Sequence, residues 1–179
     1  MAKKDWAKEY SKTFDSMPDK FKEIYMETIY DMVVNEEYSD LRVLVDVIGF
    51  PEYCESPIEQ ILWLTLNLYN LTFNKNYVFE EQAEIEANGK SYRLDFLYQE
   101  DFMEDVEHPY RLAIECDGHE FHEATKEQVI KRNNRDMDLK MEGYDVLHYS
   151  GSQIFNKPYR CAKEICEYIT KKLEEKSNG

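Results

Sequence analysis

Two runs of alternating side chains dominate the sequence: Tyr92-Arg93-Leu94-Asp95-Phe96-Leu97-Tyr98 and, after an acidic segment, Leu112-Ala113-Ile114-Glu115-Cys116-Asp117-Gly118-His119-Glu120-Phe121-His122. Side chains of a strand point alternately to its two faces. We therefore expect Asp95 and Leu97 to share one face of a first strand, with Leu94 on the other. In a second strand, Glu115 and Asp117 should share a face. A short connection would place the two strands side by side.

Three carboxylates within apolar strands indicate a functional site. Asp and Glu are depleted from strands and are rarely buried without a partner. One such acid, Asp95 for example, is usually a solvated edge residue or a salt-bridge partner. That explanation is weaker for Asp95, Glu115 and Asp117 together, because His119 and His122 follow at once. A hard divalent cation held by oxygen ligands would supply the charge that these acids need.

Length and composition indicate a cytoplasmic protein that does not enter the membrane. A chain of 179 residues with 42% apolar side chains suits one domain and a modest extension. It contains no run of about 18 uncharged apolar residues, and its start lacks the apolar stretch of a secretory signal. Four widely spaced cysteines without a CxxC pair are typical of reduced thiols: Cys54, Cys116, Cys161 and Cys166.

The net charge of −15 argues against simple nucleic-acid binding. An acidic protein is repelled by nucleic acid unless its positive charge is collected locally. Composition alone therefore favours a protein partner or a small substrate.

Residues 1–55 predict an N-terminal helical extension, and residues 56–175 a single core domain. Trp6, Tyr10 and Phe14 recur at roughly helical spacing, and Ser16 begins a second helical pattern. The segment 41–48 is ambiguous between a buried helix and a strand. Aromatic residues at such spacing usually belong to a core, so the extension is uninformative about chemistry.

A helix start is predicted at Ser56-Pro57-Ile58-Glu59. Ser at the cap, Pro at the first helical position and Glu three residues after the Ser form the pattern of a capping box. Glu59 has two compatible interpretations. It is either the capping glutamate alone or also a carboxylate directed toward the strand acids.

The rest of the chain predicts an α/β sandwich around a small mixed β-sheet flanked by helices. In order, we expect a strand over Tyr77–Phe79 and Gln82–Glu86 that acidic residues interrupt, a tight turn at Asn88-Gly89, and an exposed connection from Gln99 to Pro109. A helix over Thr125–Met141 ended by Gly143, a strand over Tyr144–Tyr149, a turn at Ser150-Gly151-Ser152, and a last amphipathic helix through Ala162 and Leu173 should follow. The first three strands should form an antiparallel meander.

The predicted helix over Thr125–Met141 carries the densest positive cluster of the chain. Lys131, Arg132 and Arg135 are candidates for contacts with nucleic-acid phosphates beside the acidic site. The alternative is a solvated helix face with internal ion pairs, for example between Glu127 and Lys131.

Taken together, these segments resemble the PD-(D/E)xK restriction-endonuclease-like superfamily, and within it the branch related to very-short-patch-repair (Vsr-like) endonucleases. The matching pieces are Ser56-Pro57-Ile58-Glu59-Gln60, Gln82, Tyr92-Arg93-Leu94-Asp95-Phe96, Ile114-Glu115-Cys116-Asp117-Gly118 with His119 and His122, and Arg135-Asp136 through Leu139 to Gly143-Tyr144-Asp145-Val146-Leu147. They occur in the family's order and span about residues 56–170. The resemblance implies a restriction-endonuclease-like sandwich.

The resemblance also implies a role for each acid. Asp95 would be the central metal-ligating aspartate, Glu115 the second acid, and Glu59 the helix acid that completes or orients the metal shell. The superfamily usually has a Lys two residues after the second acid. Here that position is Asp117, followed by the histidines, so the group that positions or deprotonates the water stays open.

The implied activity is metal-dependent hydrolysis of DNA phosphodiester bonds, in phage defence or in a mobile element. Mg²⁺ suits carboxylate ligands and lowers the pKa of a bound water, and Mn²⁺ is expected to substitute. His119 or His122 would serve as general base or leaving-group acid, although a lone His is more often structural. Because the chain is so acidic, a protein partner in trans could deliver the DNA.

Two other functions remain open from the sequence. The first is a non-catalytic, nuclease-like module that binds nucleic acid or a protein partner; the acidic charge favours it, and the intact set of Glu59, Asp95 and Glu115 opposes it. The second is a transition-metal hydrolase of small substrates, which would hold zinc tightly.

Overall fold

A computed structural model describes residues 53–100, 108–118 and 126–178, without the side chains of residues 71 and 72. The chain divides into two units, Met1–Glu52 and Tyr53–Gly179, and the described residues belong to the second. The expected helices of the N-terminal extension and the ambiguous segment 41–48 lie outside the described residues. Among the helices that are described, none has both the length and the apolar character required to cross a membrane.

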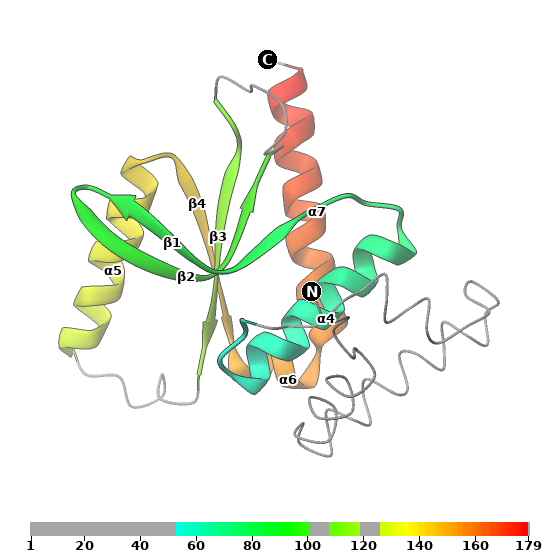
Figure 1. Cartoon of the computed structure of the whole chain (residues 1–179), viewed down its shortest axis with the longest axis horizontal. Coiled ribbons are helices and arrows are strands. Elements are labelled where there is room, and N and C mark those ends of the chain that lie inside the picture. Colours follow the sequence, from blue (N-terminus) through cyan, green and yellow to red (C-terminus); the bar gives the residue numbers. More distant parts are fainter. Residues whose placement is uncertain (1–52, 101–107, 119–125, 179) are drawn as a thin grey trace, which may run out of the picture. The chain divides into compact units, whose positions relative to one another are not determined.

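A four-stranded mixed sheet with helices on both sides forms this α/β unit (Figure 1). The elements are α4 (Pro57–Thr72), β1 (Phe79–Ala87), β2 (Lys90–Gln99), β3 (Arg111–Asp117), α5 (Lys126–Met141), β4 (Tyr144–Ser150), α6 (Gly151–Asn156) and α7 (Pro158–Ser177). Strands β1, β2 and β3 form the expected antiparallel meander. The α5 crossover brings β4 parallel to β3, which makes the sheet mixed. Figure 1 shows α5 on one side of the sheet and α4, α6 and α7 on the other.

Residues with left-handed backbone conformations confirm two predicted turns. Asn88 and Gly89 have φ angles of 50° and 69°, and the tightest hairpin turns require positive φ at both central residues. Gly143 has φ 83° and ends α5, a conformation that glycine adopts without a Cβ penalty. The turns therefore fix the β1–β2 register and the entry into β4.

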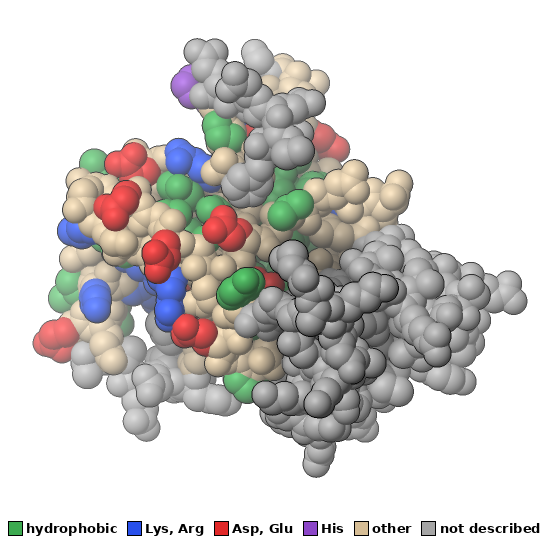
Figure 2. Space-filling model, in the orientation of Figure 1, with side chains coloured by type: hydrophobic (Ala, Val, Ile, Leu, Met, Phe, Trp, Pro, Cys, Tyr) green, Lys and Arg blue, Asp and Glu red, His purple; other side chains and the backbone are tan. Residues whose placement is uncertain are grey.

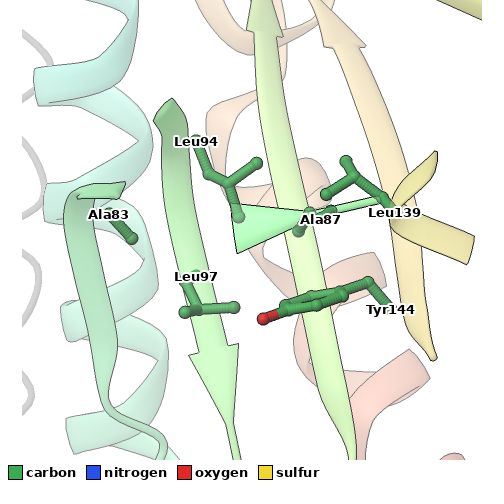
Figure 3. Close-up of a cluster of buried hydrophobic side chains, with 7 residues drawn as sticks. Ala83, Ala87, Leu94, Leu97, Leu139 and Tyr144 are labelled. Atoms are coloured by element: carbon green, nitrogen blue, oxygen red, sulfur yellow. The ribbon is translucent and has the colours of Figure 1, made fainter. Parts of the chain in front are cut away.

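A buried cluster joins α5 to the sheet and shows that β2 does not alternate strictly. Leu94 and Leu97 lie three residues apart, yet both belong to the cluster and extend toward Tyr144 and Leu139 (Figure 3). The prediction that they occupy opposite faces is wrong. The alternation is lost where β2 faces Gln82, a residue of β1 that has φ 50° and is unpaired in the ladder between Glu81–Phe96 and Ala83–Leu94.

A short helix replaces the turn expected at Ser150-Gly151-Ser152. Ser150 caps α6, since its Oγ accepts from the Gln153 backbone N–H at 3.3 Å and its own N–H donates to the Gln153 side chain at 2.9 Å. This reciprocal capping box satisfies two helix-terminal donors. The turn prediction is therefore wrong, because a helix of six residues is too short to show a periodic pattern.

Candidate functional site

The register of β2 and β3 places Asp95 and Glu115 next to each other. The β2–β3 ladder ends with Phe96 opposite Ile114, and Asp95 and Glu115 are the next residues of the two strands. The Cys116 backbone N–H donates to Asp95 Oδ2 at 2.7 Å, so the Asp95 side chain reaches across to β3. Two neighbouring strands thus deliver the two acids to one place.

Glu115, which is buried, and Asp95, which is half-buried, interact electrostatically, and Arg135 supplies positive charge to Glu115. Glu115 is only 6% exposed, and burial raises its pKa to about 8, although the Arg135 guanidinium opposes the shift and Asp95 adds to it. Burial also raises the pKa of Asp95, against the lowering effect of the Cys116 N–H, and Glu59 and Asp117 raise it further. Each carboxylate makes ionisation of its neighbours harder. A divalent cation bound among these carboxylates would lower the free energy needed to ionise them.

Glu59 serves the helix cap and also connects to the sheet. It lies in the first turn of α4 and is 6% exposed. The Ser56 hydroxyl donates to it, and the Glu59 N–H donates back to Ser56 Oγ at 3.4 Å, which is one half of the predicted capping box. The Glu55 N–H and the Gln82 side-chain amide each donate to Glu59 Oε2 at 2.8 Å. The Gln82 amide therefore ties the helix acid to β1.

Gln82 is a site residue to which the sequence assigned no role. Its Oε1 is buried and has no hydrogen-bond partner among the described residues, while its Nε2 is engaged by Glu59. An unpaired buried acceptor costs free energy. The positive φ of Gln82, which the sequence pattern does not reveal, directs this side chain to the acids.

Asp117 belongs to a second cluster, built around His148. His148 Nδ1 lies 3.3 Å from Asp117 Oδ2, and Nε2 lies 3.1 Å from Asp136 Oδ2. The hydrogen bond with Asp117 raises the pKa of His148 against the lowering effect of burial, and Asp136 adds to the rise. Sequence analysis missed His148, which lies beside Glu115 only because β4 pairs in parallel with β3.

The basic residues of α5 divide into two groups. Arg135 pairs with Glu115 and also donates to the Arg93 carbonyl at 3.0 Å, and Arg132 lies 3.6 Å from Asp117. Both guanidiniums thus contact acids of the site in this structure. Lys131 is exposed and, within the described residues, forms no ion pair, so the alternative pairing with Glu127 is not seen.

An open groove of about 910 Å³ runs between the β1–β2 hairpin and α5. Glu115, Asp117 and His148 form part of its wall, and Lys131 and Arg132 line it from α5. Over the hairpin and α5, Figure 2 shows Lys and Arg side chains gathered beside Asp and Glu side chains. The groove therefore presents Glu115 and Asp117 beside basic side chains, whereas Asp95 and Glu59 are not among its lining residues.

The donor chemistry fits a magnesium ion held by few protein ligands. No three His, Cys, Asp or Glu side chains in the described ranges converge tightly enough to form a ready metal cage. Mg²⁺ does not require one, because it commonly takes one or two carboxylates and keeps several waters. Asp95 and Glu115 suit that pattern. His119 and His122 lie outside the described residues.

Comparison of the chain with protein-family models, with curated proteins and with solved structures gives no match. The function is therefore inferred from the chemistry of the site itself.

Proposed function

We propose that this protein is a metal-dependent endonuclease that hydrolyses DNA phosphodiester bonds on a restriction-endonuclease-like fold. One observation carries the proposal: on adjacent strands, half-buried Asp95 and buried Glu115 lie next to each other, and burial raises the pKa of both. Carboxylates held in this way are suited to a hard divalent cation. The four-stranded mixed sheet and the groove beside it support the assignment.

Each acid has a role in this proposal. Asp95 and Glu115 hold Mg²⁺, and Mn²⁺ substitutes for it. Glu59, fixed by Gln82 at 2.8 Å, orients the metal shell from α4. When bound, the metal neutralises charge on the phosphate and lowers the pKa of an attacking water. The setting, phage defence or a mobile element, is proposed from the family resemblance alone.

Proton transfer is assigned to imidazoles of the site. His119 and His122 remain candidates from the sequence. Among the described residues, His148 lies on the groove wall between Asp117 and Asp136. Because Asp117 raises the pKa of His148, this ring is suited to donate a proton or a hydrogen bond to a phosphate oxygen rather than to act as a base.

A plasmid-nicking assay with Mg²⁺ or Mn²⁺ tests the activity. Wild-type protein should nick supercoiled DNA, and Asp95→Asn should lose at least about a hundredfold in rate, the order found when one group that stabilises charge in a transition state is removed. Asp145→Asn is the matched control, because Asp145 on β4 pairs with Lys172 at 3.2 Å and bonds Tyr110 and Tyr168. It should keep wild-type activity. Equal cutting by wild type and Asp95→Asn would refute the assigned site.

A second candidate is a non-catalytic module that binds nucleic acid or a protein partner. It is favoured by the ion pair between Arg135 and Glu115, which partly neutralises the acid, and by the net charge of −15. The same assay separates the two functions. A wild-type protein that cuts neither supercoiled, linear nor single-stranded DNA, nor RNA, would support the binding module.

A further inference from the structure

Two arginines of α5 are matched to two acids of β3. Arg132 and Arg135 are three residues apart on a helix, and Asp117 and Glu115 are two apart on a strand. These spacings correspond to about 4.5 Å and about 6.6 Å along the respective axes and place each pair on one face. The helix therefore carries a positive side chain to each acid. The two contacts differ in closeness: Arg132 lies 3.6 Å from Asp117, whereas Arg135 bonds Glu115 directly.

Arg135 lies between Glu115, whose charge a metal would neutralise, and the groove, where an anionic phosphate would bind. Its guanidinium Nη2 donates to Glu115 and to the Arg93 carbonyl. Its Nε is buried and finds no acceptor among the described residues. Its side chain is 25% exposed and lines the groove, so the guanidinium reaches both the acid and the groove. A guanidinium at the wall of a groove can form paired hydrogen bonds with two oxygens of a phosphate.

Glu115 is only 6% exposed, and Arg135 contacts its Oε1. A divalent cation provides more charge than one guanidinium and would bind the same carboxylate. The two cations therefore compete for the same acid.

We propose that Arg135 is a displaceable counter-cation, which neutralises Glu115 in the free protein and transfers to a substrate phosphate when a divalent cation takes its place. This rests on the proposed function of the site. Metal binding and phosphate binding are then coupled, and by linkage each strengthens the other by the same factor. Arg135 is a positioning residue that keeps the metal affinity low until an anionic backbone lies in the groove.

Mn²⁺ binding tests the competition, with free Mn²⁺ measured by its paramagnetic resonance signal at fixed pH. Arg135→Met removes the charge and keeps much of the apolar length. It should bind Mn²⁺ about tenfold more tightly than wild type, a gain of about 1.4 kcal/mol. A residue that only holds α5 to the sheet would give the opposite result, because loosening the site weakens metal binding. Arg135→Lys, which keeps the charge, should stay near the wild-type affinity.

Arg93→Met is the matched control. Arg93 lines the same groove but directs its guanidinium to Glu55 at 2.8 Å, away from Glu115. Its removal should leave Mn²⁺ affinity within about twofold of wild type. A thermal melt of every variant checks that the fold is kept. An unchanged or weaker affinity in folded Arg135→Met would overturn the proposal.

A single-stranded DNA oligonucleotide tests the transfer to phosphate. Adding it should tighten Mn²⁺ binding to wild type severalfold and have little effect on Arg135→Met, because only wild type must release Glu115. If the oligonucleotide did not change the Mn²⁺ affinity of wild type, the proposed transfer of Arg135 to a phosphate would be wrong. The Asp95→Asn variant separates failure of the proposed function from failure of this inference. If Asp95→Asn binds Mn²⁺ as tightly as wild type, the proposed metal site is wrong. If Asp95→Asn loses Mn²⁺ binding but Arg135→Met does not tighten it, only the role of Arg135 is wrong.

Discussion

Asp138 shows how a single buried acid holds the hairpin to α5. Its carboxylate accepts from Asn88 Nδ2 at 2.7 Å, from Lys90 Nζ at 2.6 Å and from the Tyr92 hydroxyl. The residue is 6% exposed, and its three donors all come from the β1–β2 hairpin. The hydrogen bonds from Lys90, Tyr92 and Asn88 lower the pKa of Asp138 to about 2. The charged form therefore stabilises the fold.

Replacement of Asp138 by Asn tests this directly. The pKa of Asp138 lies below its ordinary value in the folded chain, so its stabilisation is complete above about pH 4 and is lost as the pH falls toward 2. Asp138→Asn should therefore lower the melting temperature at pH 6. The difference from wild type should shrink as the pH falls from 4 toward 2, measured by circular dichroism melts. A difference that stays constant over this range would show that the carboxylate's charge is not responsible.

The sequence revealed the acids of the site better than its other members. Asp95 and Glu115 are conspicuous because an acid within an apolar strand is unusual. The position of His148 depends on which strand pairs with β3, and this follows from tertiary contacts rather than from the local pattern. The sequence predicted Arg135 as a phosphate contact beside the acids but did not reveal its ion pair with Glu115. Only the packing of α5 on the sheet directs it to Glu115.

Among the elements, α6 is short but lies against the site. A Cβ added to Gly151 would come 3.4 Å from the Asp117 carbonyl and 3.6 Å from the Ile58 side chain. The first residue of α6 therefore lies between the end of β3 and the start of α4. Since these two segments carry Asp117 and Glu59, the cap of α6 also helps to position the acids.

Loss of that cap should cost measurable stability. Ser150→Ala removes the hydroxyl that accepts from the Gln153 N–H, and such caps contribute about 1 kcal/mol. Urea unfolding should show this decrease in the free energy of unfolding. Ser152→Ala, an exposed position within the same helix, is the control and should change stability by less than about 0.5 kcal/mol. Equal losses in both variants would contradict the capping role.

Elements were predictable where a local signal marks their ends. Ser56-Pro57 starts α4, Asn88-Gly89 makes the hairpin and Gly143 ends α5, and all three signals reflect backbone chemistry of single residues. The alternation of β2 fails at the point where Gln82 adopts a positive φ on the partner strand. Nothing in the sequence of β2 itself indicates this loss of alternation.

For the molecule as a whole, an acidic protein that binds DNA must concentrate its positive charge. With a net charge of −15, long-range repulsion opposes the approach of a polyanion, so binding should be weak at low metal concentration and sensitive to salt. Lys131 lines the groove from α5 and, within the described part of the chain, pairs with no acid. It is therefore the side chain best placed to contact a phosphate without first leaving a partner.

Lys131→Ala should weaken DNA binding without altering sequence preference. Each lost phosphate contact reduces the slope of log K against log salt by about 1. Fluorescence anisotropy with labelled DNA, performed in the Asp95→Asn background to prevent cutting, measures this slope. Lys140→Ala, a change at an exposed position of α5 that does not line the groove, should leave it unchanged. If the Asp95→Asn protein and its Lys131→Ala and Lys140→Ala derivatives all had the same slope, the DNA would bind outside this groove.

The far end of the β2–β3 ladder has a practical consequence. The ladder runs to Gln99 opposite Arg111 and is closed by a backbone hydrogen bond of 2.8 Å from Glu100 to Tyr110. This end lies about 13 Å along β2 from Asp95, at roughly 3.3 Å per residue. A peptide epitope inserted in the segment that joins β2 to β3 should leave nicking activity and melting temperature unchanged, because the strand ends that it connects are already paired and lengthening a connection costs little entropy. The chain thus offers an anchoring point for immobilising the protein on a sensor surface while its groove stays accessible to DNA.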